Sequence, residues 1–262
     1  MKALFLALVL ALAGVSAGRA EVVCTLMVDA GSGAVRLQEG GGCEVPAAPA
    51  STFKVPLAVM GFDAGVLASR TEPAWPYKEE YRAQRPRWRV TITPESWVHE
   101  SVLWYSRELV QRLGASKFAR YVAAFDYGNA DVSGDPRRNN GLTHSWLNSS
   151  LKITPAGQVQ FFRRMLAGEL PVTAEAHRLT MDVMPKFLAG RWMVWGKTGT
   201  YYERHGDGST NTNRQYGWFV GWAEQGKERL VFAYLIHDTK KIGTPAGPRA
   251  RDALLARFSK LG

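Results

Sequence analysis

The sequence is poor in the residues that usually hold metal ions. It has only two cysteines, Cys24 and Cys43, and no Cys-x-x-Cys pair, so a thiolate zinc site has little support. The five histidines include no His-x-x-x-His pair, which is the spacing of a helical metal motif. We therefore expect no bound metal ion.

The chain also lacks an apolar run long enough to cross a bilayer. The best stretch, Ala3–Val15, follows a lysine and falls short of the roughly 20 residues that a membrane helix needs. A charged start, a short apolar core and small residues before Ala17 and Ala20 are typical of a secretory signal peptide. We expect residues 1–20 to be that peptide, cleaved after Ala17 or Ala20, and the mature protein to be periplasmic or secreted and free of the membrane. The alternative is a short membrane anchor.

Long blocks of like charge are absent, although the formal net charge is +10. The densest basic group lies between Pro76 and Pro94, has no helical spacing and is diluted by Glu79 and Glu80. Its members are Arg82, Arg85, Arg87 and Arg89. Nucleic-acid binding usually needs a basic stripe or patch, so we expect no nucleic-acid partner. A positive surface would also suit a small anionic substrate.

The two cysteines flank a segment that resembles a β-hairpin. Strand-like runs at 25–28 and 35–37 enclose a turn at Asp29–Gly33, and this shape would bring Cys24 and Cys43 together. In an oxidising compartment the pair would form a disulfide. Two free buried thiols are the alternative.

The remaining patterns predict an α+β fold for residues 21–262, which we expect to form a single domain. Helix patterning covers residues 51–60, 94–126, 155–166 and 247–261, a polar loop covers 127–144, and strand-like runs cover 192–195, 216–223 and 229–236. Strands at both chain ends indicate one antiparallel sheet, flanked by helices, with an all-helical lobe from the middle of the chain. A ligand cleft would lie between the lobes.

The first chemical motif is Ser51-x-x-Lys54, at the start of a predicted buried helix. Residues three apart share a helix face, so the hydroxyl and the amine would point the same way. Serine needs an adjacent base to become a nucleophile, and burial would favour the neutral amine of Lys54. Alone the motif is weak, because an N-cap serine followed by a surface lysine has the same spacing.

The second motif is Lys197-Thr198-Gly199-Thr200, which follows an apolar run and therefore lies on a strand that leaves the core. A lysine beside a hydroxyl, with a glycine that permits close backbone approach, would make a carboxylate-binding strand edge. A solvated edge strand is the alternative. Both motifs in this order mark penicillin-recognising serine enzymes.

Four segments resemble the class D serine β-lactamases, the oxacillinases, whose members share the penicillin-recognising fold. They are Pro49-Ala50-Ser51-Thr52-Phe53-Lys54-Val55-Pro56, Ser101-Val102-Leu103-Trp104, the Tyr127-Gly128-Asn129 loop, and Ser145-Trp146-Leu147 with Leu151-Lys152-Ile153. Leu103 stands where the family usually has valine. No Ser-Asp-Asn triplet is present, which disfavours class A.

The resemblance implies a catalytic domain that hydrolyses β-lactams through an acyl-enzyme on Ser51. Lys54, carboxylated by CO2, would be the general base, with no other cofactor bound. Trp146 would donate its indole N–H to the carbamate, and Val102, Leu103 and Leu147 would keep the pocket dry.

The same resemblance implies roles around the substrate. The backbone N–H groups of Ser51 and Thr200 would form the oxyanion hole, and Ser101 and Lys197 would relay a proton to the leaving nitrogen. Thr198, beside Gly199, and an arginine would hold the substrate carboxylate.

Two arginines on the last predicted helix could supply that cation. Arg251 precedes Leu254, Leu255 and Phe258 by three, four and seven residues and so shares their face, whereas Arg249 aligns with Ala253. We favour Arg251. A solvated helix start is the alternative for either.

Two rival functions use the same motifs. One is a penicillin-binding sensor domain that is acylated without turnover, and the other is a peptidoglycan D,D-transpeptidase or carboxypeptidase. The small-molecule β-lactam remains the expected partner, and the protein could be a monomer or a homodimer.

Overall fold

The structure is a computed structural model that describes residues 20–261. The expected signal peptide covers residues 1–20, of which all but Ala20 lie outside the described residues. Among residues 20–261, no helix combines the length and the apolarity that a bilayer span requires.

One six-stranded antiparallel sheet organises the molecule, in the order β2-β1-β6-β5-β4-β3. Its strands are β1 (Glu21–Asp29), β2 (Val35–Glu39), β3 (Lys186–Ala189), β4 (Trp192–Arg204), β5 (Thr210–Gln225) and β6 (Glu228–His237). The N-terminal strand β1 pairs with β6, from Glu21 opposite His237 to Asp29 opposite Leu230. The expectation of a single sheet built from both chain ends is therefore confirmed.

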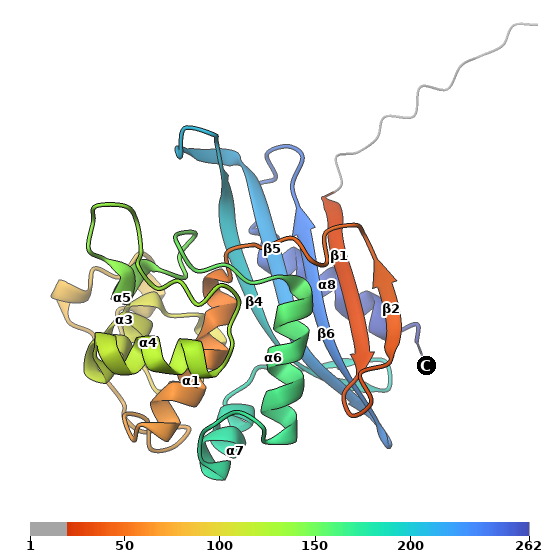
Figure 1. Ribbon diagram of the computed structural model, residues 1–262, viewed down its shortest axis with the longest axis horizontal. Helices are drawn as coiled ribbons and strands as arrows, with labels where there is room; N and C mark the ends of the chain where they lie inside the picture. Colours follow the sequence, from red (N-terminus) through yellow and green to blue (C-terminus); the bar gives the residue numbers. More distant parts are fainter. Residues whose placement is uncertain (1–19, 262) are drawn as a thin grey trace, which may run out of the picture.

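Helices cover both faces of this sheet and also form the second lobe (Figure 1). They are α1 (Lys54–Asp63), α2 (Pro94–Glu100), α3 (Leu103–Leu113), α4 (Ala115–Ala124), α5 (Gly141–His144), α6 (Pro155–Ala167), α7 (Ala174–Asp182) and α8 (Ala246–Phe258), with short 3-10 turns at Ala50–Phe53, Glu79–Tyr81 and Pro86–Trp88. α8 packs on one face and α6 on the other, and α1 to α5 lie to one side.

Coverage on both faces explains the unusual strand sequences. Residues 217–223 of β5 and 230–236 of β6 are buried without alternation, because side chains on either face meet a helical layer. One core cluster joins Phe219 and Phe232 to Leu254 and Phe258 of α8, and a larger cluster lies between the sheet and the other helices.

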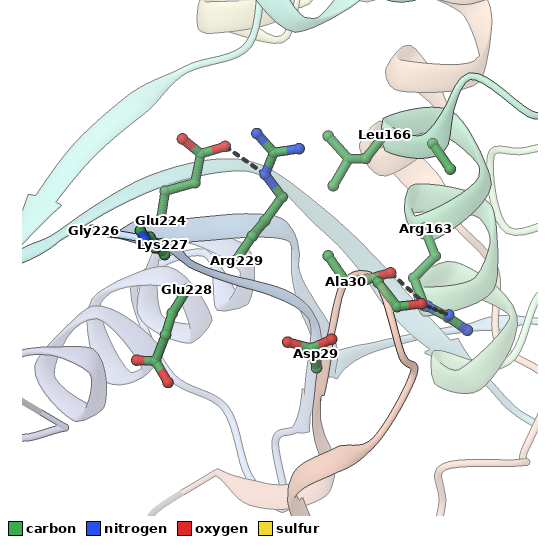
Figure 2. A pocket seen from close by; sticks show the side chains of 11 residues that line it. Asp29, Ala30, Arg163, Leu166, Glu224, Gly226, Lys227, Glu228 and Arg229 are labelled. Atoms are coloured by element: carbon green, nitrogen blue, oxygen red, sulfur yellow. Dashed lines mark hydrogen bonds and ion pairs between the residues drawn. The ribbon is translucent and has the colours of Figure 1, made fainter.

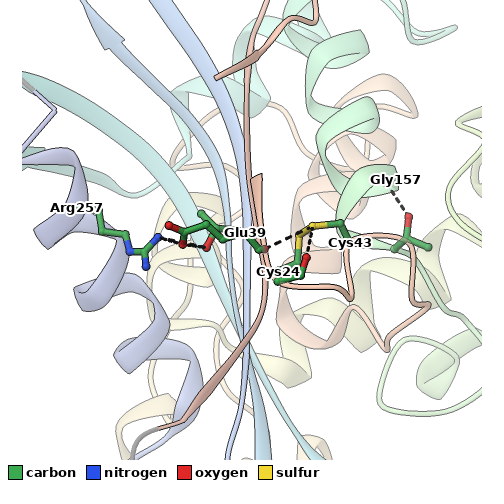
Figure 3. Close-up of a disulfide and its surroundings, with 8 residues drawn as sticks. Cys24, Glu39, Cys43, Gly157 and Arg257 are labelled. Atoms are coloured by element: carbon green, nitrogen blue, oxygen red, sulfur yellow. Dashed lines mark hydrogen bonds and ion pairs between the residues drawn. A yellow bond between two sulfur atoms is a disulfide. The ribbon is translucent and has the colours of Figure 1, made fainter. Parts of the chain in front are cut away.

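The two cysteines form a disulfide, as expected (Figure 3). Cys24 lies in β1, and Cys43 follows the end of β2 by four residues. Both residues are buried. A cross-link over 19 residues of chain stabilises a fold by about 3 kcal/mol in the chain-entropy model. It also fixes to the sheet the segment that leads from Cys43 to Ser51.

The helix pattern expected over residues 94–126 is split into three helices. α2 ends where Ser101 adopts a left-handed conformation with φ 59°, and α3 ends at Gly114 with φ 78°. The expected polar loop over 127–144 also contains the short helix α5 at its end. Sequence patterns did not predict β3 or α7.

Candidate active site

The largest group of predicted site residues lines one cleft of about 520 Å³ between the sheet edge and the helical lobe. These residues are Ser51, Ser101, Thr198, Gly199, Thr200 and Arg251. They come from the turn before α1, the break between α2 and α3, strand β4 and helix α8. Segments 200 residues apart in sequence thus meet at the expected position between the lobes.

Ser51 lies in the 3-10 turn that continues into α1. Contacts from two distant segments hold this turn. The indole of Trp218 donates to the carbonyl of Ala48 at 2.9 Å, and the backbone N–H of Ala50 donates to the carbonyl of Trp146 at 3.0 Å. Ala50 has φ 49°, which is strained for alanine and characteristic of functional sites. Ser51 is only half-buried, and its hydroxyl forms no hydrogen bond with the described residues.

Strand β4 approaches this turn closely at Gly199. A Cβ atom at Gly199 would lie 3.0 Å from the carbonyl oxygen of Pro49 and 3.1 Å from Thr52. A side chain at this position would therefore require the strand or the Ser51 turn to shift by a few tenths of an ångström. β3 pairs only with residues 192–195, so residues 198–200 have no strand on the side away from β5. The backbone of this unpaired edge lines the cleft and is therefore available to a ligand there.

Ser101 and Lys197 are in direct contact. The amine of Lys197 donates to the hydroxyl of Ser101 and to the carbonyl of Thr198, both at 3.1 Å. Burial lowers the pKa of Lys197 to about 7, with a further decrease from Arg251 and an opposing increase from Glu100. An amine with that pKa can both accept and release a proton near neutral pH.

Lys54 is the first residue of α1 and is 2% exposed. Burial lowers its pKa well below the ordinary value, and the nearby Lys197 lowers it further. Its amine has no hydrogen bond and no ion pair within residues 20–261. Both effects favour the uncharged form of this amine.

The residues predicted to enclose Lys54 lie in the apolar core or pack against it. Trp146 is 1% exposed and stacks on Phe53 at a centroid distance of 5.5 Å, and its indole N–H has no hydrogen-bond partner among the described residues. Val102 is fully buried, whereas Leu103 and Leu147 are half-buried against the same core cluster. Five of the predicted site residues do not line the open cleft. They are Lys54, Lys197, Trp146, Leu103 and Leu147.

The structure places the two candidate arginines differently. Arg251 lines the cleft, pairs with the exposed Asp252 and lies over the ring of Phe187. Arg249 instead forms a 2.6 Å ion pair with Asp238, which is 1% exposed, and donates to the carbonyl of Thr244. Arg249 therefore holds the loop before α8 in place.

The Tyr127-Gly128-Asn129 loop lies away from the cleft and has a structural role. A Cβ at Gly128 would collide with the carbonyl of Lys152. The side-chain amide of Asn129 donates to the carbonyl of Ser150 and accepts from the N–H of Lys152. This pairing anchors the segment that follows Trp146.

Sequence reasoning missed several cleft residues. Arg85, Arg87, Trp88, His99, Glu100, Tyr202, Gln215, Pro245 and Pro248 also line it. The basic group before Pro94 was the only available signal, and no local pattern places that segment beside Ser51.

A different cavity, of about 440 Å³, lies beside the β5–β6 turn and α6 (Figure 2). Arg229 pairs with Glu224, and Arg163 donates to the carbonyls of Ala30 and Gly31. None of the predicted site residues lines it. Among residues 20–261, no group of three or more His, Cys, Asp or Glu side chains could hold a metal ion.

Comparisons with known proteins agree with the geometry of the cleft. Residues 23–258 match the family model of the penicillin-binding protein transpeptidase domain. The chain is 41% identical to β-lactamase OXA-9 of Klebsiella pneumoniae, over 98% of this chain and 94% of that protein. It is 38% identical to β-lactamase OXA-1 of Escherichia coli, over 76% and 70%. The crystal structure of the OXA-427 class D β-lactamase superposes with a TM-score of 0.84 at 40% identity, covering 91% of this chain and 97% of that one.

Proposed function

The chain belongs to the class D serine β-lactamases, and on that basis we propose that it hydrolyses penicillin-type antibiotics through an acyl-enzyme on Ser51, with a carboxylated Lys54 as base. The observation that carries the proposal is the position of Ser51, accessible in the cleft and three residues before a buried amine of lowered pKa. The disulfide supports action in the periplasm or outside the cell, where such bonds persist.

The surroundings of Lys54 fit a carbamate. Burial favours the uncharged amine, and among residues 20–261 neither this amine nor the indole N–H of Trp146 forms a hydrogen bond. When present, the carbamate supplies an anionic oxygen that takes the proton of Ser51 and later that of water. Val102, Leu103 and Leu147 pack in or against the core cluster and would help to exclude bulk water, which favours the uncharged form of a buried amine.

Ser51 and Thr200 stabilise the charge that develops on the attacked carbonyl oxygen. The close approach at Gly199 brings strand β4 against the Ser51 turn, so that backbone N–H groups from both can converge. The Thr200 hydroxyl accepts from the N–H of Gly247 at 2.9 Å, which ties this part of β4 to α8. Each oxyanion donor contributes about 3–4 kcal/mol to the transition state.

Lys197 and Ser101 deliver a proton to the departing ring nitrogen. Their contact at 3.1 Å and the Lys197 pKa of about 7 allow the amine to recharge the hydroxyl after each transfer. The left-handed backbone of Ser101 aims this residue from the helix break into the cleft.

Turnover of a chromogenic cephalosporin tests this function. We expect the purified protein to hydrolyse many equivalents of substrate, because the base that activates Ser51 also activates water. A burst limited to one equivalent would identify a sensor domain instead. Release of D-alanine from a peptide that ends in D-Ala-D-Ala, without cephalosporin turnover, would identify a carboxypeptidase.

Arg251→Ala should raise KM for benzylpenicillin by roughly ten-fold or more, since a charge-assisted contact with the substrate carboxylate is lost. The melting temperature should change little, because the partner Asp252 is exposed. Steady-state kinetics and thermal denaturation measure both effects.

Arg249→Ala is the matched comparison. It leaves the buried Asp238 unpaired, so we expect a clear fall in melting temperature. If Arg249→Ala has the selective effect on KM and Arg251→Ala does not, the carboxylate is held by the other arginine.

A further inference from the structure

Two arginines of one short loop form part of the cleft wall opposite the strand. Arg85 and Arg87 lie on either side of Pro86, at the 3-10 turn Pro86–Trp88. Both side chains line the cleft that contains Ser51, and both are exposed. They belong to the helical lobe, whereas Arg251 enters the same cleft from α8.

The loop is held rigidly at this position. Trp88 is 6% exposed, its indole donates to the carbonyl of Glu100 at 3.2 Å, and its own carbonyl accepts from the indole of Trp104 at 2.9 Å. Glu100 directly precedes Ser101. The hydrogen bond from Trp88 to Glu100 therefore fixes the loop of Arg85 and Arg87 next to Ser101.

Both guanidinium groups retain donors for an anion. Arg85 lies over the ring of Trp88 at 5.1 Å, which occupies its face and leaves its N–H edge available. Arg87 pairs with Glu100 through Nε at 3.4 Å, so its terminal nitrogens remain available. Within residues 20–261, Arg85 has no ion pair.

The cleft carries more positive charge than one carboxylate can balance. Three arginines line it, and Glu100 is the one acidic side chain in its lining among the described residues. The carboxylate of the β-lactam ring system would occupy Arg251 and Thr198 under the proposed function. On the other wall, Glu100 balances only one of the two positive charges of Arg85 and Arg87.

We propose that Arg85 and Arg87 form a second anion subsite that favours β-lactams with an additional carboxylate on the acyl side chain. This inference rests on the proposed function. A single exposed charge pair contributes little, but both guanidinium groups line the same cleft, so their attractions for one dianionic ligand add. The residues determine specificity and take no part in the bond-breaking steps.

Two penicillins that differ by one carboxylate provide the test. Benzylpenicillin carries only the ring carboxylate, and α-carboxybenzylpenicillin carries a second one on the side chain. The quantity to measure is the ratio of kcat/KM for the dianion to that for the monoanion. R85Q/R87Q should lower this ratio by roughly three- to ten-fold, and in wild type the ratio should fall as salt rises.

A charge-matched variant distinguishes a local anion subsite from the general electrostatic attraction of the basic segment. R82Q/R89Q removes the same charge from the same exposed segment, but neither residue lines the cleft. We expect it to retain the wild-type ratio. An equal fall in R82Q/R89Q, or equal losses for both penicillins in R85Q/R87Q, would overturn the subsite. Absence of any benzylpenicillin turnover in wild type would instead reject the proposed function itself.

Discussion

Ser51→Ala should reduce hydrolysis of β-lactams by roughly 10⁴-fold or more, to the limit of detection. Under the proposed function the substitution removes the atom that would form the acyl bond, and loss of a serine nucleophile can cost about 10⁶-fold in kcat. Ser51 is half-buried in the turn, so the loss of one hydroxyl should leave the fold intact. Steady-state rates and a thermal melt test both expectations.

Mass spectrometry identifies the acylated residue directly. Wild-type protein mixed with a slowly hydrolysed β-lactam should gain the mass of one substrate, on the peptide that contains Ser51. Ser209→Ala, at an exposed turn, provides a control that should retain full activity. An adduct on another peptide, or an active Ser51→Ala variant, would refute the assignment of the nucleophile.

Activity should depend on CO2 through Lys54. A carbamate forms only on the neutral amine, and burial keeps the pKa of Lys54 well below that of an exposed lysine. Above this lowered pKa the amine is neutral and can bind CO2. As the pH falls through it, the amine is protonated and the carbamate is lost. We therefore expect activity to fall in acid and in CO2-depleted buffer, and added bicarbonate to restore it in depleted buffer at neutral pH.

Lys54→Ala should block deacylation most severely. Without the base, Ser51 should acylate slowly and the acyl-enzyme should persist, so that a mass adduct remains for hours while turnover is lost. An unmodified ammonium that only positions Ser51 would behave differently. In that case bicarbonate would have no effect at any pH.

Trp146 offers a finer test of the same chemistry. Trp146→Phe retains the aromatic stacking on Phe53 and removes only the N–H, so we expect a higher bicarbonate concentration for half-maximal activity. Trp146→Ala also creates a large cavity, which commonly costs 3–5 kcal/mol, so the phenylalanine variant is the more informative. An unchanged bicarbonate requirement in Trp146→Phe would remove the indole from the carbamate site.

Local patterns in the sequence predicted most of the fold. The N-cap and proline at Thr154-Pro155 mark the start of α6, where the Thr154 hydroxyl accepts from the N–H of Gly157. The apolar runs in β5 and β6 are buried on both faces, as such runs usually are. β3 has only four residues, two of them exposed, and therefore lacks a pattern that distinguishes it from a loop.

Sequence reasoning was weaker for the site, because clefts form between segments that are distant in the chain. Ser51, Ser101 and Thr198 could be identified from short motifs, and the structure brings them into one cleft. Arg85 and Arg87 belong to no motif. Their relevance depends on how Trp88 docks under Glu100, which is a tertiary contact that periodicity does not report.

The pairing of β1 with β6 has a consequence for the order of assembly during synthesis. Ser51 and Lys54 leave the ribosome early, but the turn that presents them is held by Trp218 and faces Gly199. Until the final third of the chain has been made, β1 has no neighbour on its β6 side, and the part of β4 that contains the proposed oxyanion donor is absent. Such long-range pairings also slow folding. Under the proposed function, a nascent chain would therefore not react with β-lactams until almost all of it has emerged.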